Sequence, residues 1–104
     1  METTELIDLL SLGEDSRQQF KENVTNADAL AAEIVAFSNT AGGKIFIGVR
    51  NDGSVLGLSG TDIDRLNQLV SNSASQNVRP AVNPLTENVP HPNGTVMMLT
   101  IAEG

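Results

Sequence analysis

Residues 34–57, IVAFSNTAGGKIFIGVRNDGSVLG, constrain the fold of this chain more than any other segment. Their pattern predicts the end of a helix, a glycine turn at Gly42-Gly43, a strand over residues 45–49 and a tight turn at Asp52-Gly53. The strand is almost continuously apolar, which is typical of a central strand covered on both faces. We therefore expect residues 45–49 to lie inside a sheet, with residues 55–56 beginning a returning strand.

Helices are expected on both sides of this segment. The first covers residues 3–12 and is capped by Thr3 or Thr4. The second begins at Thr25, the first residue of a capping-box pattern that Asp28 completes, and ends near Thr40. The third begins at Thr61, which Asp64 follows in the same pattern, and it fades through the polar residues 71–77, which Pro80 ends.

Further strands are expected at residues 17–21, 82–89 and 95–101. The first of these is an edge strand. The last two form a hairpin through Pro92-Asn93-Gly94, and residues 95–101 carry apolar side chains on both faces, as an interior strand does. Because hairpins predominate, we expect an α+β fold with three helices and a mixed, mostly antiparallel sheet of about five strands.

The composition limits the chemistry that is available. The chain has no cysteine, which excludes disulfides, thiolate metal ligands and a cysteine nucleophile. With three Phe and no Trp or Tyr, it has almost no aromatic platform on which an unstacked base could lie. No segment approaches the roughly 20 apolar residues of a membrane span, and the acidic N-terminus is unlike a signal peptide. We expect a cytoplasmic protein with no membrane partner.

The charge opposes simple phosphate binding, because the net charge is −7 and the pI is near 4.4. A nucleic-acid partner would require a local basic patch, a basic partner domain or metal-bridged phosphates. Lys21, Lys44 and Arg50 are the basic residues nearest the central segment, and we expect them to contribute to one surface. Arg17 and Arg79 are further candidates. The alternative is that these charges are scattered and only solubilise the domain.

The glycine turn has a structural and a functional interpretation. It can simply reverse the chain, or it can let the backbone amides of Gly43 and Lys44 approach a phosphate. Asn39 and Thr40 precede the turn and can serve as helix terminators or as ligand contacts. A Walker A motif is rejected, because Ser38 and Ile45 stand where the motif needs glycine and a hydroxyl residue, and the helix precedes the strand.

Several short motifs occur in a fixed order along the chain. They are Phe20-Lys21, AFSNT at residues 36–40, Gly42-Gly43, IGV at residues 47–49, and Gly57. The set, between Glu14 and Ile101, resembles the Schlafen AlbA-type domain, a family also described as DNA-binding and formerly as a divergent AAA domain. The resemblance implies a compact α+β domain at the N-terminus of a bacterial transcriptional regulator or helicase-like protein. We expect residues 1–104 to be one such domain, cut from a longer regulator whose downstream domain is its partner.

Some Schlafen proteins that this domain resembles cut RNA with carboxylates that hold metal ions between them. Glu14 stands at the first acidic position of that pattern. Gln19 occupies the second position, and at the third the chain has Arg50-Asn51 before Asp52. Two of the three positions are degraded, so we expect no catalytic residue and no metal ligand.

The primary hypothesis is a DNA-binding or RNA-binding domain of a bacterial transcriptional regulator that is not an enzyme and uses no cofactor. Binding by the isolated domain is expected to be weak. The candidate binding residues are Lys21, Asn39, Thr40, Gly42, Gly43, Lys44 and Arg50. The alternatives are an oligomerisation or protein-interaction domain, which would form a homodimer without nucleic-acid affinity, and a metal-dependent ribonuclease.

Overall fold

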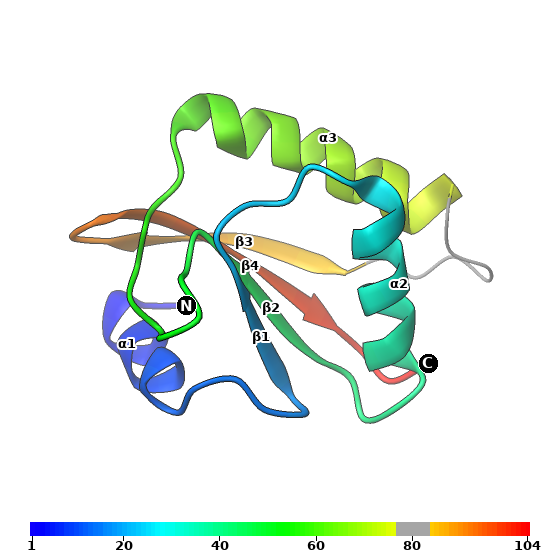
Figure 1. Ribbon diagram of the computed structural model, residues 1–104, viewed down its shortest axis with the longest axis horizontal. Helices are drawn as coiled ribbons and strands as arrows, with labels where there is room; N and C mark the ends of the chain where they lie inside the picture. The colour runs from blue at the N-terminus through cyan, green and yellow to red at the C-terminus, as the bar shows by residue number, and fades with distance from the viewer. Residues whose placement is uncertain (77–83) are drawn as a thin grey trace.

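The computed structural model describes residues 1–76 and 84–104, and their side chains outside residues 73–76. The elements in chain order are α1 (Thr3–Ser11), β1 (Gln18–Lys21), α2 (Ala27–Ser38), β2 (Gly43–Ile47), α3 (Gly60–Gln76), β3 (Leu85–His91) and β4 (Gly94–Ile101). Within the described residues the chain therefore has three helices and four strands, and the expected α+β fold is confirmed (Figure 1). Pro80, Arg79 and the expected strand start at residues 82–83 lie outside the described part.

The sheet has the strand order β1-β2-β4-β3. β1 runs parallel to β2, and the other two neighbouring pairs are antiparallel, so the sheet is mixed and mostly antiparallel as expected. The predictions that β2 and β4 are interior strands and that β1 is an edge strand are confirmed. The expected returning strand after Asp52-Gly53 is reduced to one isolated antiparallel bridge, between Val49 and Val55.

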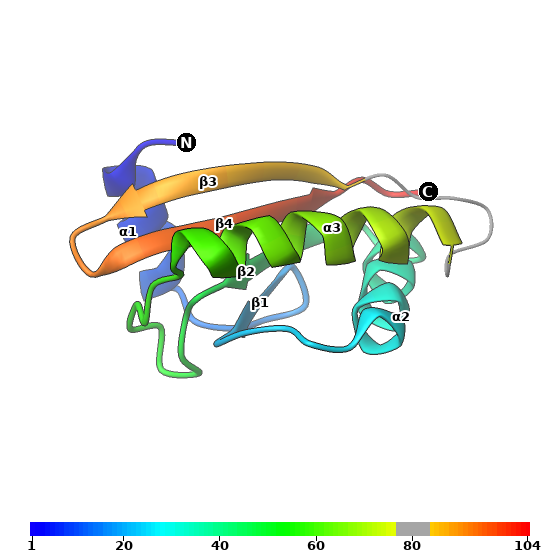
Figure 2. The same ribbon diagram turned by 90° about the horizontal axis from the view of Figure 1, so that it is seen from above.

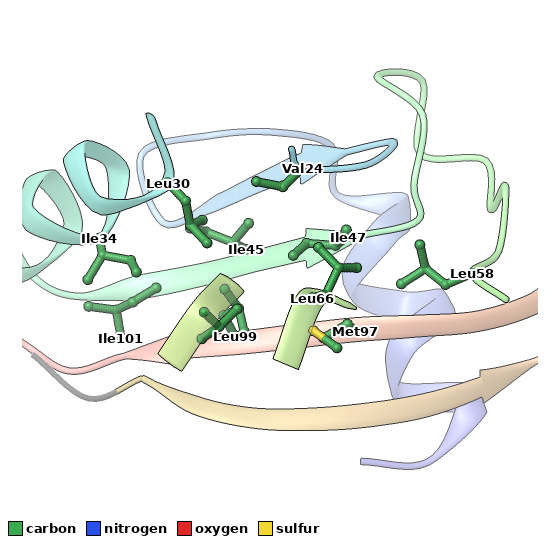
Figure 3. Close-up of a cluster of buried hydrophobic side chains, with 11 residues drawn as sticks. Val24, Leu30, Ile34, Ile45, Ile47, Leu58, Leu66, Met97, Leu99 and Ile101 are labelled. Atoms are coloured by element: carbon green, nitrogen blue, oxygen red, sulfur yellow. The ribbon is translucent and has the colours of Figure 1, made fainter. Parts of the chain in front are cut away.

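Alternating side chains on the strands build two apolar layers, one on each face of the sheet. α2 and α3 cover one face, where Ile45, Ile47 and Leu99 pack against Leu30 and Leu66 (Figure 3). α1 covers the other face, and its cluster consists of Leu6, Leu10, Phe20, Phe46, Val49, Val55, Val89, Val96 and Met98 (Figure 2). The sheet thus has a face toward α1 and a face toward α2 and α3, and each strand residue can be assigned to one of them.

Three of the expected helix caps are wrong by one or two residues. α1 begins after Glu2, which makes no side-chain capping bond. The cap of α2 is Asn26, not Thr25, and its Oδ1 accepts the backbone N–H groups of Asp28 and Ala29. At α3, Ser59 and not Thr61 occupies the capping position.

The capping box of α3 is reciprocal. The Ser59 hydroxyl oxygen accepts the Asp62 N–H at 3.1 Å, and Asp62 Oδ2 accepts the Ser59 N–H at 3.2 Å. These hydrogen bonds from Ser59 hold the pKa of the Asp62 carboxyl below its usual value of 3.8. In the described residues, no helix is long and apolar enough to cross a membrane.

Candidate functional site

The glycine turn between α2 and β2 packs tightly against the rest of the protein. Gly42 has a φ angle of +78°, as the sequence predicts, and its N–H donates to the Phe37 carbonyl at 2.9 Å. A methyl group at Gly42 would lie 2.5 Å from the Ile101 carbonyl oxygen, and one at Gly43 would overlap the Phe37 ring. Both glycines are therefore required by the internal packing of the turn.

Asn39 and Thr40 serve as the end of α2. Asn39 is the C-cap residue, and its N–H donates to the Val35 carbonyl at 2.9 Å. The Thr40 hydroxyl donates to the Phe37 carbonyl at 3.0 Å. These contacts fit the interpretation of both residues as helix terminators, and Thr40 is already engaged as a donor.

Lys44, the residue after the glycine turn, is half-buried on the α1 face of β2. Its Nζ atom donates to the Thr100 hydroxyl at 3.3 Å, across from β4. Its backbone N–H donates to the Arg17 carbonyl at 2.9 Å, because the loop before β1 pairs with the start of β2. The expectation that the Lys44 amide can approach a phosphate is therefore wrong, and the side chain is the part of Lys44 that remains for a ligand.

Arg17 and Lys44 line one groove at the end of the sheet where β1 and β2 begin. Figure 1 shows the loops that lead into these two strands side by side at that end. The groove has a volume of about 340 Å³. Its lining combines the two cations, the glycine turn and part of α1: Leu9, Leu12, Asp15, Arg17, Gln18, Ala41, Gly42, Gly43, Lys44, Thr100 and Ile101. We call it the Arg17–Lys44 groove.

Asp15 also lines this groove, but the backbone holds its carboxylate. Asp15 Oδ1 accepts the N–H of Arg17 at 2.7 Å and that of Gln18 at 3.0 Å. The Gln18 side chain is similarly engaged, since its Nε2 donates to the Leu9 and Gly13 carbonyls. These bonds fix the loop between α1 and β1, so the position from which Arg17 extends is well defined.

The other two expected cations do not join this groove. Lys21 forms an ion pair with Glu33 of α2 at 2.6 Å, so it lies on the face opposite to Lys44 and at the other end of the strands. Arg50 is exposed in the turn beyond β2, where it contributes to the lowered pKa of Asp52 after the larger effect of hydrogen bonds from Ser54. The expectation that Lys21, Lys44 and Arg50 share one surface is wrong. Side chains alternate between the two faces along a strand, and this alternation places Lys21 and Lys44 on opposite faces of the sheet.

The three positions of the carboxylate pattern do not come together in one site. Glu14 Oε1 accepts the Phe20 N–H at 2.8 Å and so satisfies the outer edge of β1. Glu14 and Gln19 line a second pocket with Glu33, whereas Asp52 lines a third one beside α1 and His91. Among the described residues, no group of three His, Cys, Asp or Glu side chains could hold a metal ion.

Sequence reasoning missed the part of the groove that α1 and β4 supply. Thr100 is recognisable only through the register of β4 against β2, which pairs it with Lys44. The sequence pattern places Leu9 on the apolar side of the first helix and gives Leu12 no role, yet Leu12 is 69% exposed and lines the groove with Leu9. The sequence shows only that Leu12 stands beside Gly13, the glycine that ends the helix. That pattern does not indicate which groove the leucine side chain lines.

Two solved structures share this fold. One is the N-terminal domain of a RecG-related protein from Nitrosomonas europaea, with a TM-score of 0.68 and 24% identity over 100% of this chain and 74% of that chain. The other is the DIP2311 protein from Corynebacterium diphtheriae, with a TM-score of 0.62 and 21% identity over 98% of this chain and 26% of that chain. No curated protein matches the sequence.

The match to a family covers most of the sequence. Residues 14–104 match the family described as Schlafen, AlbA_2. The match begins at Glu14, the first residue of the ordered motifs, and it includes both strands that carry the Arg17–Lys44 groove. The resemblance inferred from those motifs is confirmed, and the chain belongs to the Schlafen, AlbA_2 family.

Proposed function

We propose that this domain binds nucleic acid without cleaving it, and that the Arg17–Lys44 groove is the contact site. The observation that carries the proposal is the convergence of two cations from separate elements on one groove of a chain with net charge −7. Arg17 precedes β1 and Lys44 begins β2, so their proximity follows from the fold and not from sequence proximity. Two converging cations are suited to a phosphate of a polynucleotide backbone.

The cations of this groove differ from other basic residues in whether they form ion pairs with carboxylates. Among the described residues, carboxylates pair with Lys21 and Arg65, whereas Lys44 contacts a hydroxyl group. Arg65 in addition donates to the Val24 carbonyl and the Asn23 side chain, which fixes it as a structural residue. Arg50 is exposed beside the Asp52 carboxylate and outside the groove, so Arg17 and Lys44 are the two cations that share a groove for an external anion.

We further propose that the domain acts within a larger transcriptional regulator, and that other domains supply most of the affinity. Family membership and the likeness to the N-terminal domain of a RecG-related protein support this role. The chain corresponds to only 26% of the Corynebacterium protein, so a domain of this kind occurs within a much longer chain. Two phosphate contacts on an acidic body provide weak, salt-sensitive binding.

The test is fluorescence anisotropy at low salt with labelled DNA and RNA of mixed sequence, both single-stranded and duplex. The variant Arg17→Gln/Lys44→Gln is compared with the matched control Lys21→Gln/Arg50→Gln. Each removes two positive charges, so they change the long-range field of the protein equally. We expect the groove variant to lose at least about tenfold in affinity and the control to lose less than about threefold.

Equal losses in the two variants would show that only the net charge matters, and would remove the groove from the proposal. Circular dichroism of both variants checks that each still folds. Absence of binding by the unmodified chain to every probe would contradict the proposed function itself.

A protein-interaction role is the second candidate, and one observation favours it. β3 is an edge strand of the described sheet, and Leu85 at its start is 74% exposed. An exposed edge with an apolar residue can pair with another chain. Sedimentation equilibrium distinguishes the two candidates, because a stable dimer without nucleic-acid affinity would support this one.

A further inference from the structure

The Arg17–Lys44 groove has an apolar wall beside its cations. Leu9 and Leu12, at the end of α1 and just beyond it, line the same groove as Arg17 and Lys44. Leu12 is the C-cap residue of α1 and is 69% exposed, so its side chain is free to contact a ligand. A single exposed leucine is ordinary, but one that shares a groove with two cations adds an apolar contact to a charged site.

We infer that this groove takes an unpaired nucleotide, so that the domain prefers single-stranded nucleic acid to a duplex. The inference rests on the proposed function and specifies its ligand. In a duplex, the base faces are stacked inside, so a protein meets the sugar, the phosphate and the edges of the bases. An unpaired nucleotide presents a phosphate together with a flat apolar base, which are the two features that the cations and the leucines complement.

The volume of the groove falls within the range of sites that hold one small ligand. Its volume of about 340 Å³ lies at the lower end of small-ligand sites, which span roughly 300–1,000 Å³. The phosphate would lie toward Arg17 and Lys44, and the base would lie against Leu12. Single-stranded DNA and RNA share this chemistry.

The aromatic residues do not offer a competing platform for a base. Phe20 and Phe46 contact each other edge to face in the buried layer under α1, with their ring centroids 6.0 Å apart. Phe37 packs against the apolar layer under α2 and α3 and lines a different pocket, whose charged residues are the acidic Glu14, Asp15 and Glu33. The chain has no Trp or Tyr, so the leucine wall is the place where the described structure offers a base an apolar surface beside cations.

The experiment measures anisotropy of the full chain with three labelled probes of one sequence: a short single-stranded DNA, the corresponding RNA, and the DNA duplex. We expect at least one single strand to bind about fivefold or more tightly than the duplex. Leu12→Ser should weaken single-strand binding by about threefold to fivefold and leave duplex binding unchanged. Leu56→Ser is the control, since Leu56 is an exposed apolar residue (41%) that lies between β2 and α3, outside the lining of the groove.

The outcomes separate this inference from the proposed function. Equal affinity for strand and duplex, with both lost in Arg17→Gln/Lys44→Gln, would overturn the preference and retain nucleic-acid binding. An equal effect of Leu12→Ser and Leu56→Ser would also overturn it. If one single strand binds more tightly than both the other strand and the duplex, the inference holds and the comparison identifies DNA or RNA as the source of the nucleotide.

Discussion

The backbone N–H of Lys44 donates a hydrogen bond to the carbonyl oxygen of Arg17 at 2.9 Å. This bond links the loop before β1 to the start of β2, so the two cations of the groove extend from directly adjacent backbone segments. The distance between the backbones of the two residues is therefore set by this pairing, although Arg17 itself lies in the loop before β1. A site whose backbone is ordered before a ligand arrives loses less entropy on binding.

The two cations of the groove predict how the binding constant depends on salt concentration. Each phosphate neutralised on a single strand contributes about −0.7 to the slope of log K against log salt concentration. If Arg17 and Lys44 each neutralise one phosphate, Arg17→Gln/Lys44→Gln should make that slope less negative by about 1.4. Anisotropy titrations at four salt concentrations measure the slope. An unchanged slope would mean that neither cation releases a counterion on binding.

The glycine turn predicts a loss of stability that depends on local geometry. Gly42→Ala combines a positive φ angle of +78° with a methyl group 2.5 Å from the Ile101 carbonyl oxygen. We expect it to lower the free energy of unfolding by about 2–3 kcal/mol. Gly60→Ala is the control, since nothing lies within 4 Å of a methyl group there. Urea denaturation measures both variants, and similar losses would contradict the packing argument.

The capping box of α3 gives a test of the corrected helix start. Ser59→Ala removes the hydroxyl that accepts the Asp62 N–H, and should cost about 1 kcal/mol in the free energy of unfolding. Thr61→Ala changes the exposed residue that the sequence suggested as the cap, and should cost less than about 0.5 kcal/mol. Denaturant titration of the two variants separates the assignments. A larger loss for Thr61→Ala would restore the original one.

Much of the fold could be predicted from the sequence because its signals are local. The apolar run at residues 45–49 and the hairpin around Asn93 each indicate their structure within a few residues. The helix caps were displaced because Thr25-Asn26 and Ser59-Gly60-Thr61 each offer more than one capping residue within a short span. Which of them caps the helix depends on the path of the preceding loop, which tertiary contacts decide.

The site could be predicted only in part, since it depends on long-range register. Gly42, Gly43 and Lys44 are adjacent in the sequence and do line the groove. The pairing of Lys44 with Thr100 and the closeness of Arg17 depend on which strands become neighbours. The sequence suggests one surface for Lys21 and Lys44, whereas the alternation of side chains along the strands places them on opposite faces of the sheet. A one-residue shift in strand register would exchange the faces of every side chain, and the sequence alone does not fix that register.

Two hydrogen-bonded carboxylates, one in the turn after β2 and one in the capping box of α3, predict how stability responds to acid. The pKa of Asp62 is lowered mainly by hydrogen bonds from Ser59, and that of Asp52 mainly by hydrogen bonds from Ser54, each relative to 3.8. Below that value the unfolded chain binds more protons at these groups than the folded chain does. Their contribution is therefore present above about pH 4 and is lost as the pH falls through the lower folded values.

The variant Asp52→Asn/Asp62→Asn should flatten the acid branch of the stability curve. Urea denaturation between about pH 2.5 and 6 measures that branch. Asp64→Asn, which changes an exposed carboxylate on the same helix, is the control and should retain the unmodified steepness. If the double variant is as steep as the unmodified chain, other carboxylates account for the acid sensitivity.

We expect the loss of Lys21 to lower the stability of the domain without weakening its binding to nucleic acid. Its ion pair with Glu33 at 2.6 Å joins β1 to α2, and both side chains are 26% exposed. Loss of the cation leaves a half-buried carboxylate whose Oε2 atom already lacks a hydrogen-bond partner in the described structure. Lys21→Gln should lower the free energy of unfolding by about 0.5–1 kcal/mol and leave nucleic-acid affinity within about twofold. Denaturation and anisotropy on one preparation measure both quantities, and a selective loss of binding would return Lys21 to the site.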